Sequence, residues 1–148
     1  MIKITFPDKA VREYPEGVTP FEIAQSISEG LARNILSAKV NEEIIDITRP
    51  LNEDASITFY TWENEQGKAA FWHSSAHLMA EAIEFFYPGA KFGIGPDIES
   101  GFYYDIDFEG RPISSEDFKK IEDKMLEIAR QKNAYKRKDV SKADAIEY

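Results

Sequence analysis

Residues 1–30 read MIKITFPDKAVREYPEGVTPFEIAQSISEG, and this stretch decides the fold of the first part of the chain. Apolar and polar residues alternate over residues 2–6, and the turn sequence Pro7-Asp8-Lys9 leads into a second extended segment over 10–14. Alternation with a period of two on both sides of a proline-containing turn indicates two paired strands. The chain is therefore expected to open with a β-hairpin.

A helix is expected next, because Thr19-Pro20-Phe21-Glu22 has the form of a capping box with proline at the first helical position. Gly30 is expected to end this helix. Three more strands are then predicted, over residues 36–40, 43–47 and 56–60. The order β-β-α-β-β-β in about sixty residues is typical of a ubiquitin-like β-grasp fold.

Residues 1–62 also resemble a TGS domain. The resemblance lies in the Pro7-Asp8-Lys9 turn, in Gly17-Val18-Thr19 before the helix, and in Gly30-Leu31-Ala32 after it. TGS domains occur in threonyl-tRNA synthetases, in (p)ppGpp enzymes of the stringent response and in some GTPases. No nucleophile, phosphate-binding loop or histidine is recognisable in this segment, so on its own terms it is a binding module or a spacer.

The second part of the chain, residues 63–148, is expected to begin with a short linker over 63–68 that contains Gly67. A long helix is predicted from Ala69 to Tyr87, where Pro88-Gly89 stops it. Its apolar residues form a wide stripe, which predicts a largely buried helix. The stripe consists of Phe71, Trp72, Ala76, Leu78, Met79, Ala82, Ile83, Phe85 and Phe86.

The only two histidines of the chain, His73 and His77, are four residues apart on this helix and therefore share one face. Spacing alone leaves three interpretations open: a surface pair without a task, metal ligation, or acid–base and substrate contact. A zinc site needs further protein ligands, and only Glu84, two turns on, is a weak candidate. No metal ligand is therefore assigned.

The sequence His73-Ser74-Ser75-Ala76-His77 is followed by Ile94-Gly95-Pro96 and by Gly101-Phe102-Tyr103-Tyr104-Asp105. This combination resembles the editing domain of bacterial-type threonyl-tRNA synthetases, which is related to that of alanyl-tRNA synthetases. The resemblance implies that residues 63–148 are the first part of a proofreading domain that hydrolyses seryl-tRNA(Thr). It also implies that His73 and His77 are catalytic, and that Gly95 and Tyr104 shape the substrate pocket.

The resemblance carries further expectations for a longer parent enzyme. The parent would attach threonine to tRNA(Thr) with ATP, and its aminoacylation core would use Mg²⁺ and a bound Zn²⁺. The partners would be the tRNA(Thr) acceptor end and the remainder of the synthetase. The other pocket groups, a lysine and a motif with cysteine and histidine, would lie beyond residue 148. The chain is thus expected to be a fragment that is inactive and monomeric alone, whereas the parent is a homodimer.

The last third of the chain is expected to hold a helix over 115–132, a strand over 134–140, and a further helix that begins with the capping box Ser141-Lys142-Ala143-Asp144. Five basic residues cluster where the predicted helix ends and the predicted strand follows. They are Arg130, Lys132, Lys136, Arg137 and Lys138. Such a cluster is either a solvated helix end or a contact for tRNA phosphates. The predicted class is α+β throughout.

Composition limits the remaining possibilities. The chain has 148 residues, a net charge of −9 and no cysteine, so disulfides and thiolate metal sites are excluded. No apolar run is long enough to span a membrane, and a cytoplasmic protein is expected. The rival hypothesis is a regulatory TGS-containing binding module, which accounts for residues 1–62 but gives the two histidines no purpose.

Overall fold

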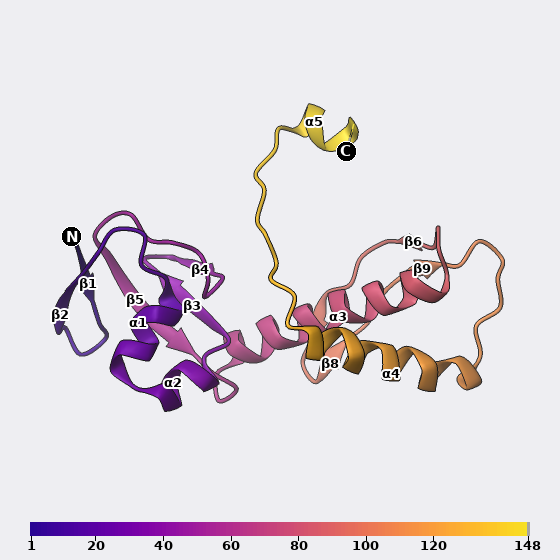
Figure 1. The fold of residues 1–148 in the computed structure, drawn as a ribbon, viewed down its shortest axis with the longest axis horizontal. Coiled ribbons are helices and arrows are strands. Elements are labelled where there is room, and N and C mark those ends of the chain that lie inside the picture. Colours follow the sequence, from indigo (N-terminus) through magenta and orange to yellow (C-terminus); the bar gives the residue numbers. More distant parts are fainter. Residues whose placement is uncertain (148) are drawn as a thin grey trace. The chain divides into compact units, whose positions relative to one another are not determined.

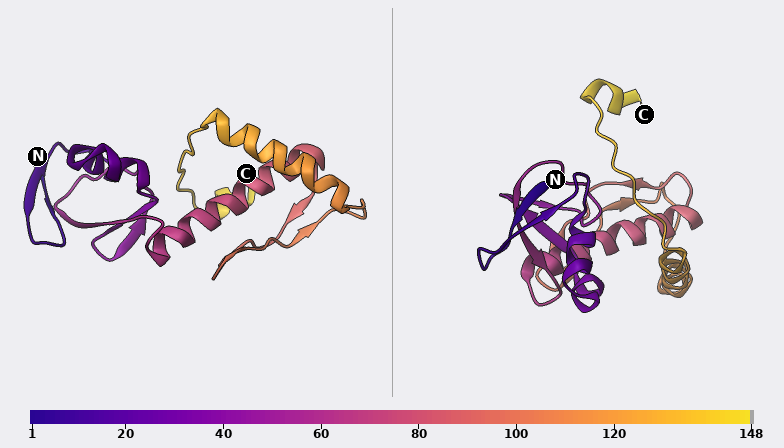
Figure 2. Two further views of the ribbon diagram at one scale, coloured as in Figure 1. Left: turned by 90° about the horizontal axis from the view of Figure 1, so that it is seen from below. Right: turned by 60° about the vertical axis from the view of Figure 1, so that its left-hand side comes forward.

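A computed structural model describes residues 1–147, and Figures 1 and 2 show its ribbon. The chain forms two compact units. The first comprises Met1–His77 and Phe92–Ile106, and the second comprises Leu78–Lys91 and the residues from Asp107 onward. The predicted domain boundary between residues 62 and 63 stays a prediction.

The first unit begins with the expected β-grasp fold. Its elements are β1 (Ile2–Thr5), β2 (Val11–Tyr14), α1 (Pro20–Ile27), α2 (Glu29–Asn34), β3 (Ser37–Val40), β4 (Glu43–Ile45) and β5 (Ala55–Tyr60). The five strands form one sheet in the order β2-β1-β5-β3-β4 (Figure 1). Only the central pair, β1 and β5, is parallel, while the other pairs are antiparallel. The predicted hairpin, the first helix and the fold class are confirmed.

The core of this unit follows from the alternation seen in the sequence. Ile4 of β1 and Ile57 of β5 are almost fully buried, and Ile23 and Ala24 of α1 belong to the same buried cluster. The start of α1 is fixed by the capping box, in which Thr19 Oγ1 accepts a hydrogen bond from Glu22 N at 3.2 Å. Burial of these aliphatic side chains is the main stabilising term of the unit.

The prediction that Gly30 ends the first helix is wrong. Helix α1 already ends at Ile27, and Ser28 adopts an extended conformation with φ −163° and ψ 145°. Its hydroxyl then accepts a hydrogen bond from Leu31 N at 3.0 Å, which starts α2. Ser28 therefore closes one helix and caps the next, and Gly30 lies inside the second.

The prediction of a linker over residues 63–68 is also wrong, because helix α3 (Glu65–Phe86) begins before Ala69. Asn64 Oδ1 accepts a hydrogen bond from Thr61 N at 2.9 Å, and Lys68 N donates to Asn64 O at 3.0 Å. Gly67 is buried in the first turns, where an added Cβ would lie 2.0 Å from Thr61 O. The glycine thus allows the helix to pack directly on the chain that leaves β5.

We predict that Gly67→Ala lowers the free energy of unfolding by about 1–3 kcal/mol, because the new methyl group overlaps a backbone carbonyl. Gly30→Ala is the matched control, since its Cβ would meet only Ser28 Oγ, at 3.8 Å. It should leave stability unchanged or raise it by up to about 1 kcal/mol. Urea unfolding followed by circular dichroism measures both, and equal effects would contradict the packing described here.

The second unit consists of the end of α3, helix α4 (Ser115–Gln131), helix α5 (Lys142–Glu147) and the segments between them. The buried apolar residues of α4 are Ile121 and Ile128. The rings of Tyr87 and Phe108 meet edge to face with centroids 5.1 Å apart, and Arg111 Nε donates to Phe108 O at 3.0 Å. These contacts hold the chain after α3 in place.

Helix α3 is less buried than its apolar stripe predicted. Ala82 and Ile83 are buried, but 60% of Phe85 and 42% of Phe71 are exposed. Phe85 instead lies under the ammonium group of Lys124, whose Nζ is 3.7 Å from the ring centroid.

The strand predicted over residues 134–140 is absent, since residues 133–140 are exposed and have no regular structure. Helix α4 ends at Gln131, and its C-cap residue Lys132 takes the left-handed conformation with φ 52° and ψ 40°. Four consecutive residues in the middle of the following segment, 136–139, are charged, so the segment has no continuous apolar face to place against a sheet. The predicted start of a helix at Ser141 is confirmed, because Asp144 N donates to Ser141 Oγ at 3.2 Å at the start of α5.

Asp117 in the first turn of α4 generates a prediction about pH. The Lys120 ammonium group and the Ser114 backbone N–H lower the pKa of Asp117 from 3.8 to about 2. Because the folded-state pKa is depressed, the stability that Asp117 contributes is complete above pH ~4 and is lost as pH falls towards ~2. Asp117→Asn should therefore destabilise the chain near neutral pH, and the difference from wild type should vanish in acid. Urea unfolding at several pH values tests this, and a difference independent of pH would refute it.

Candidate functional site

The two histidines lie on the exposed surface of α3, on the same face, as the spacing predicted. His77 Nε2 and His73 Nε2 are 3.1 Å apart, and the ring centroids are 4.6 Å apart with an interplanar angle of 88°. A hydrogen bond of this kind needs one Nε2–H and one Nε2 lone pair, so two neutral rings that form it are different tautomers. The structure thus brings together the two residues that were predicted to be catalytic.

The residues between the histidines explain why the imidazoles point outward. Ala76 is buried, with 1% of its surface exposed, and this fixes the inner face of the helix. Ser74 Oγ donates to Ala70 O at 2.7 Å, and Ser75 Oγ donates to Phe71 O at 2.8 Å. Because both hydroxyls donate their protons to carbonyls of the preceding turn, these protons are not available to the imidazoles, which contact each other.

Gly95 and Tyr104, the predicted pocket residues, are in direct contact. A Cβ on Gly95 would lie 2.6 Å from Tyr104 Cδ2, so the ring rests against the glycine backbone. Two backbone hydrogen bonds hold the segments together, from Gly93 N to Asp105 O at 2.8 Å and from Asp105 N to Ile94 O at 2.9 Å. Gly95 is therefore required by close packing, and its φ is not in the left-handed region.

Short strands carry these segments. They are β6 (Lys91–Phe92), β7 (Asp97–Ile98), β8 (Gly101–Phe102) and β9 (Ile106–Asp107). Strand β6 pairs with β9 and β7 with β8. Trp72 of α3 contacts Phe102 of β8, with ring centroids 6.3 Å apart. Within the described residues 1–147, no hydrogen bond or ring contact joins the histidine pair to Gly95 and Tyr104.

Two aromatic contacts of this unit were not predicted from the sequence. The ring of Phe92 stands edge-on to that of Tyr104, with centroids 5.6 Å apart. Trp62 contacts both Phe71 and Trp72, at 5.2 and 5.7 Å between centroids. The concentration of three large aromatic rings in residues 62–72 was the available signal for the second cluster.

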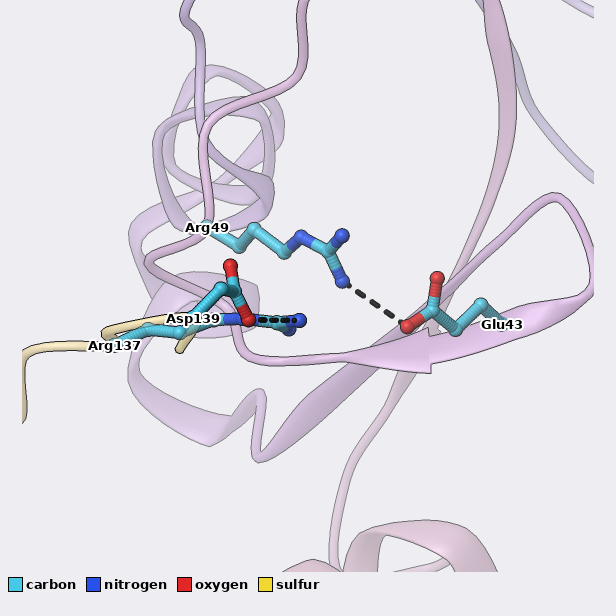
Figure 3. A network of polar contacts seen from close by, with 4 residues as sticks. All are labelled: Glu43, Arg49, Arg137 and Asp139. Atoms are coloured by element: carbon cyan, nitrogen blue, oxygen red, sulfur yellow. Dashed lines mark hydrogen bonds and ion pairs between the residues drawn. The ribbon is translucent and has the colours of Figure 1, made fainter. Parts of the chain in front are cut away.

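The five basic residues predicted to contact phosphate are exposed and lie at the end of α4 and in the irregular segment after it. Arg137 pairs with Asp139, with Nη2 3.0 Å from Oδ1, so a carboxylate accompanies the cluster. Figure 3 shows this pair, together with the separate ion pair of Arg49 and Glu43 in the first unit. The phosphate contact stays a prediction.

Among residues 1–147, no group of three or more histidine, aspartate and glutamate side chains is arranged to hold a metal ion. No helix in the same range is both long and apolar enough to cross a membrane.

Residues 2–61 match the family model of the TGS domain. The chain is 60% identical over 148 residues to the threonine–tRNA ligase of Cytophaga hutchinsonii. It is 58% identical over 146 residues to that of Parabacteroides distasonis, and 54% identical over 147 residues to that of Flavobacterium johnsoniae. These matches cover 99–100% of the chain, which spans only 22–23% of the length of these relatives.

The contact of Gly95 with Tyr104 generates a prediction. Gly95→Ala should lower the free energy of unfolding by about 1–3 kcal/mol, because the methyl group overlaps the ring. In the double variant Gly95→Ala/Tyr104→Ala the overlap is gone, so the two effects should not add. A double-mutant cycle in urea measures the coupling, and strictly additive effects would show that the glycine and the ring do not touch.

Proposed function

We propose that residues 1–148 form the N-terminal part of a threonine–tRNA ligase, and that His73 and His77 belong to a site that hydrolyses seryl-tRNA(Thr). Similarity to such ligases over almost the whole chain supports the first part of the proposal. The observation that carries the second part is the exposed histidine pair, with Nε2 atoms 3.1 Å apart on a helix fixed to the TGS domain.

A ligase for threonine needs such a site on energetic grounds. Serine is smaller than threonine by one methyl group and has the same hydroxyl, so it fits any pocket built for threonine. A missing methyl group provides only about 1–3 kcal/mol of discrimination, or 10–200-fold. A second site, too narrow for the threonine methyl group, removes the error by hydrolysing the wrong ester.

The histidines provide the proton transfer that the hydrolysis requires. Water attacks the ester carbonyl carbon and gives up a proton, the bond from this carbon to the ribose oxygen breaks, and the ribose hydroxyl takes up a proton. Neutral imidazole is a suitable base at neutral pH. His73 would bind or deprotonate the water, or bind the terminal ribose hydroxyl, and His77 would hold the ring of His73 through Nε2.

Other residues complete the proposal. The Tyr104 ring, packed on Gly95, would form part of the pocket wall, and the basic residues around the end of α4 would meet tRNA phosphates. They are Arg130, Lys132, Lys136, Arg137 and Lys138. The remaining pocket groups, and the core that would use ATP, Mg²⁺ and Zn²⁺, would belong to the ligase outside residues 1–148. The chain alone is therefore expected to leave the ester intact.

The test is deacylation of seryl-tRNA(Thr), with threonyl-tRNA(Thr) as the competing substrate, by the whole ligase and by residues 1–148. The ligase should clear only the seryl ester. His73→Ala should slow this by about 10²-fold or more, since general base catalysis contributes that much. Glu84→Ala, two turns further along α3, is the matched control and should retain the rate. If the whole ligase spares both esters, or if His73→Ala deacylates normally, the histidines have no part in proofreading.

A further inference from the structure

Three large aromatic rings gather around the start of α3, within the first unit. Trp62 contacts both Phe71 and Trp72, and Trp72 also contacts Phe102 of β8. Rings of this size usually bury most of their surface, yet 44% of Trp62 and 42% of Phe71 are exposed. Exposed tryptophan and phenylalanine side chains that are grouped in this way are typical of a surface that binds another molecule.

A cavity of about 490 Å³ lies beside this aromatic cluster and also belongs to the first unit. Its lining residues come from the first turns of α3 and from β7 with the residue that follows it. Trp72 forms part of the wall, together with Ala69 and Ile98, and 49% of Ile98 is exposed. The volume is sufficient for a long side chain or a small ligand.

The charged groups of the cavity are mostly negative. Glu65, Asp97 and Glu99 line it, and within residues 1–147 their carboxylates have no ion pair and no hydrogen bond. The lining contains one ammonium group, that of Lys68, which lies over the Trp62 ring with Nζ 5.8 Å from the centroid. Three carboxylates therefore face one ammonium group, and the cavity combines an aromatic wall with an excess of negative charge.

This combination selects a cation. Aromatic faces attract cations through the ring quadrupole, and carboxylates attract them by their charge. Phosphate groups are repelled by the same carboxylates, which makes the cavity unsuited to an RNA backbone. The guanidinium group of arginine is planar, stacks on aromatic rings and forms paired hydrogen bonds with carboxylates. The ammonium group of lysine is more strongly hydrated and cannot form such pairs.

We propose that this cavity binds the arginine side chain of a polypeptide partner, and that the exposed rings of Trp62 and Phe71 contact the partner around it. Arginine and aromatic residues are enriched at the centres of protein interfaces, where one long side chain fills a pocket and apolar contacts surround it. The inference does not depend on the proposed function, because neither the histidine pair nor tRNA takes part in the contact.

Both tryptophans of the chain, Trp62 and Trp72, belong to this surface, so tryptophan fluorescence reports binding directly. The probe is the tripeptide acetyl-Gly-Arg-Gly-amide, titrated into residues 1–148 without tRNA. It should change the fluorescence saturably. The same tripeptide with citrulline, which has nearly the shape of arginine but no charge, should bind roughly fivefold more weakly or worse, because the cation–π attraction and the charge-assisted hydrogen bonds are lost.

The double variant Asp97→Asn/Glu99→Gln tests the carboxylates and should weaken binding of the arginine peptide by roughly tenfold. Glu13→Gln, which neutralises an exposed carboxylate on β2, is the matched control and should bind as wild type does. Circular dichroism confirms that each variant is folded.

Three results would overturn the proposal. The first is the absence of a saturable change with the arginine peptide at millimolar concentrations. The second is equal binding of the arginine and citrulline peptides, or of wild type and the double variant. The third is tighter binding of a short single-stranded RNA than of the arginine peptide, which would assign the exposed rings to base stacking.

Discussion

The close approach of Gly67 to the carbonyl of Thr61 is the constraint on which the arrangement of the first unit depends. With a glycine at this position, α3 can begin within a few residues of the end of β5 and lie against the chain there. Hydrogen bonds around Asn64 hold the same turn. The rotation of α3 about its axis is therefore set at its start, and this rotation decides that Ala76 faces inward while His73 and His77 face outward.

The features that the sequence predicted correctly are those whose cause is local. The capping box at Thr19 and the alternation in β1 and β2 act over a few residues, so they can be identified without knowledge of the fold. The errors concern residues whose role depends on a distant or alternative partner. Glycine usually weakens or ends a helix. Gly30 nevertheless lies inside a helix that Ser28 caps, and Gly67 lies in a helix at the point where it packs closely against Thr61. Residues 134–140 do not form a strand, because a strand needs a partner strand and an apolar face.

The candidate site also combines features with a local cause and features that depend on packing between distant residues. The shared face of the two histidines follows from helical periodicity alone, whereas their separation of 3.1 Å depends on rotamers that no sequence pattern specifies. The contact between Gly95 and Tyr104 joins residues nine apart across two short strand pairs, and only the resemblance to editing domains connected them. The ring of Phe92 beside Tyr104 carried no signal, because an isolated aromatic residue next to a glycine is compatible with many environments.

The hydrogen bond within the histidine pair decides which ring nitrogen can act as a base. A base that takes a proton from water needs a free ring-nitrogen lone pair. The hydrogen bond between the rings occupies one lone pair and leaves none for a third group at Nε2 of either histidine. At Nε2, water must therefore displace the shared proton before it can bind. When His73 is the donor, its Nε2–H holds the ring against His77 while its Nδ1 keeps a free lone pair, so in the proposed hydrolysis Nδ1 is the atom that takes the proton from water.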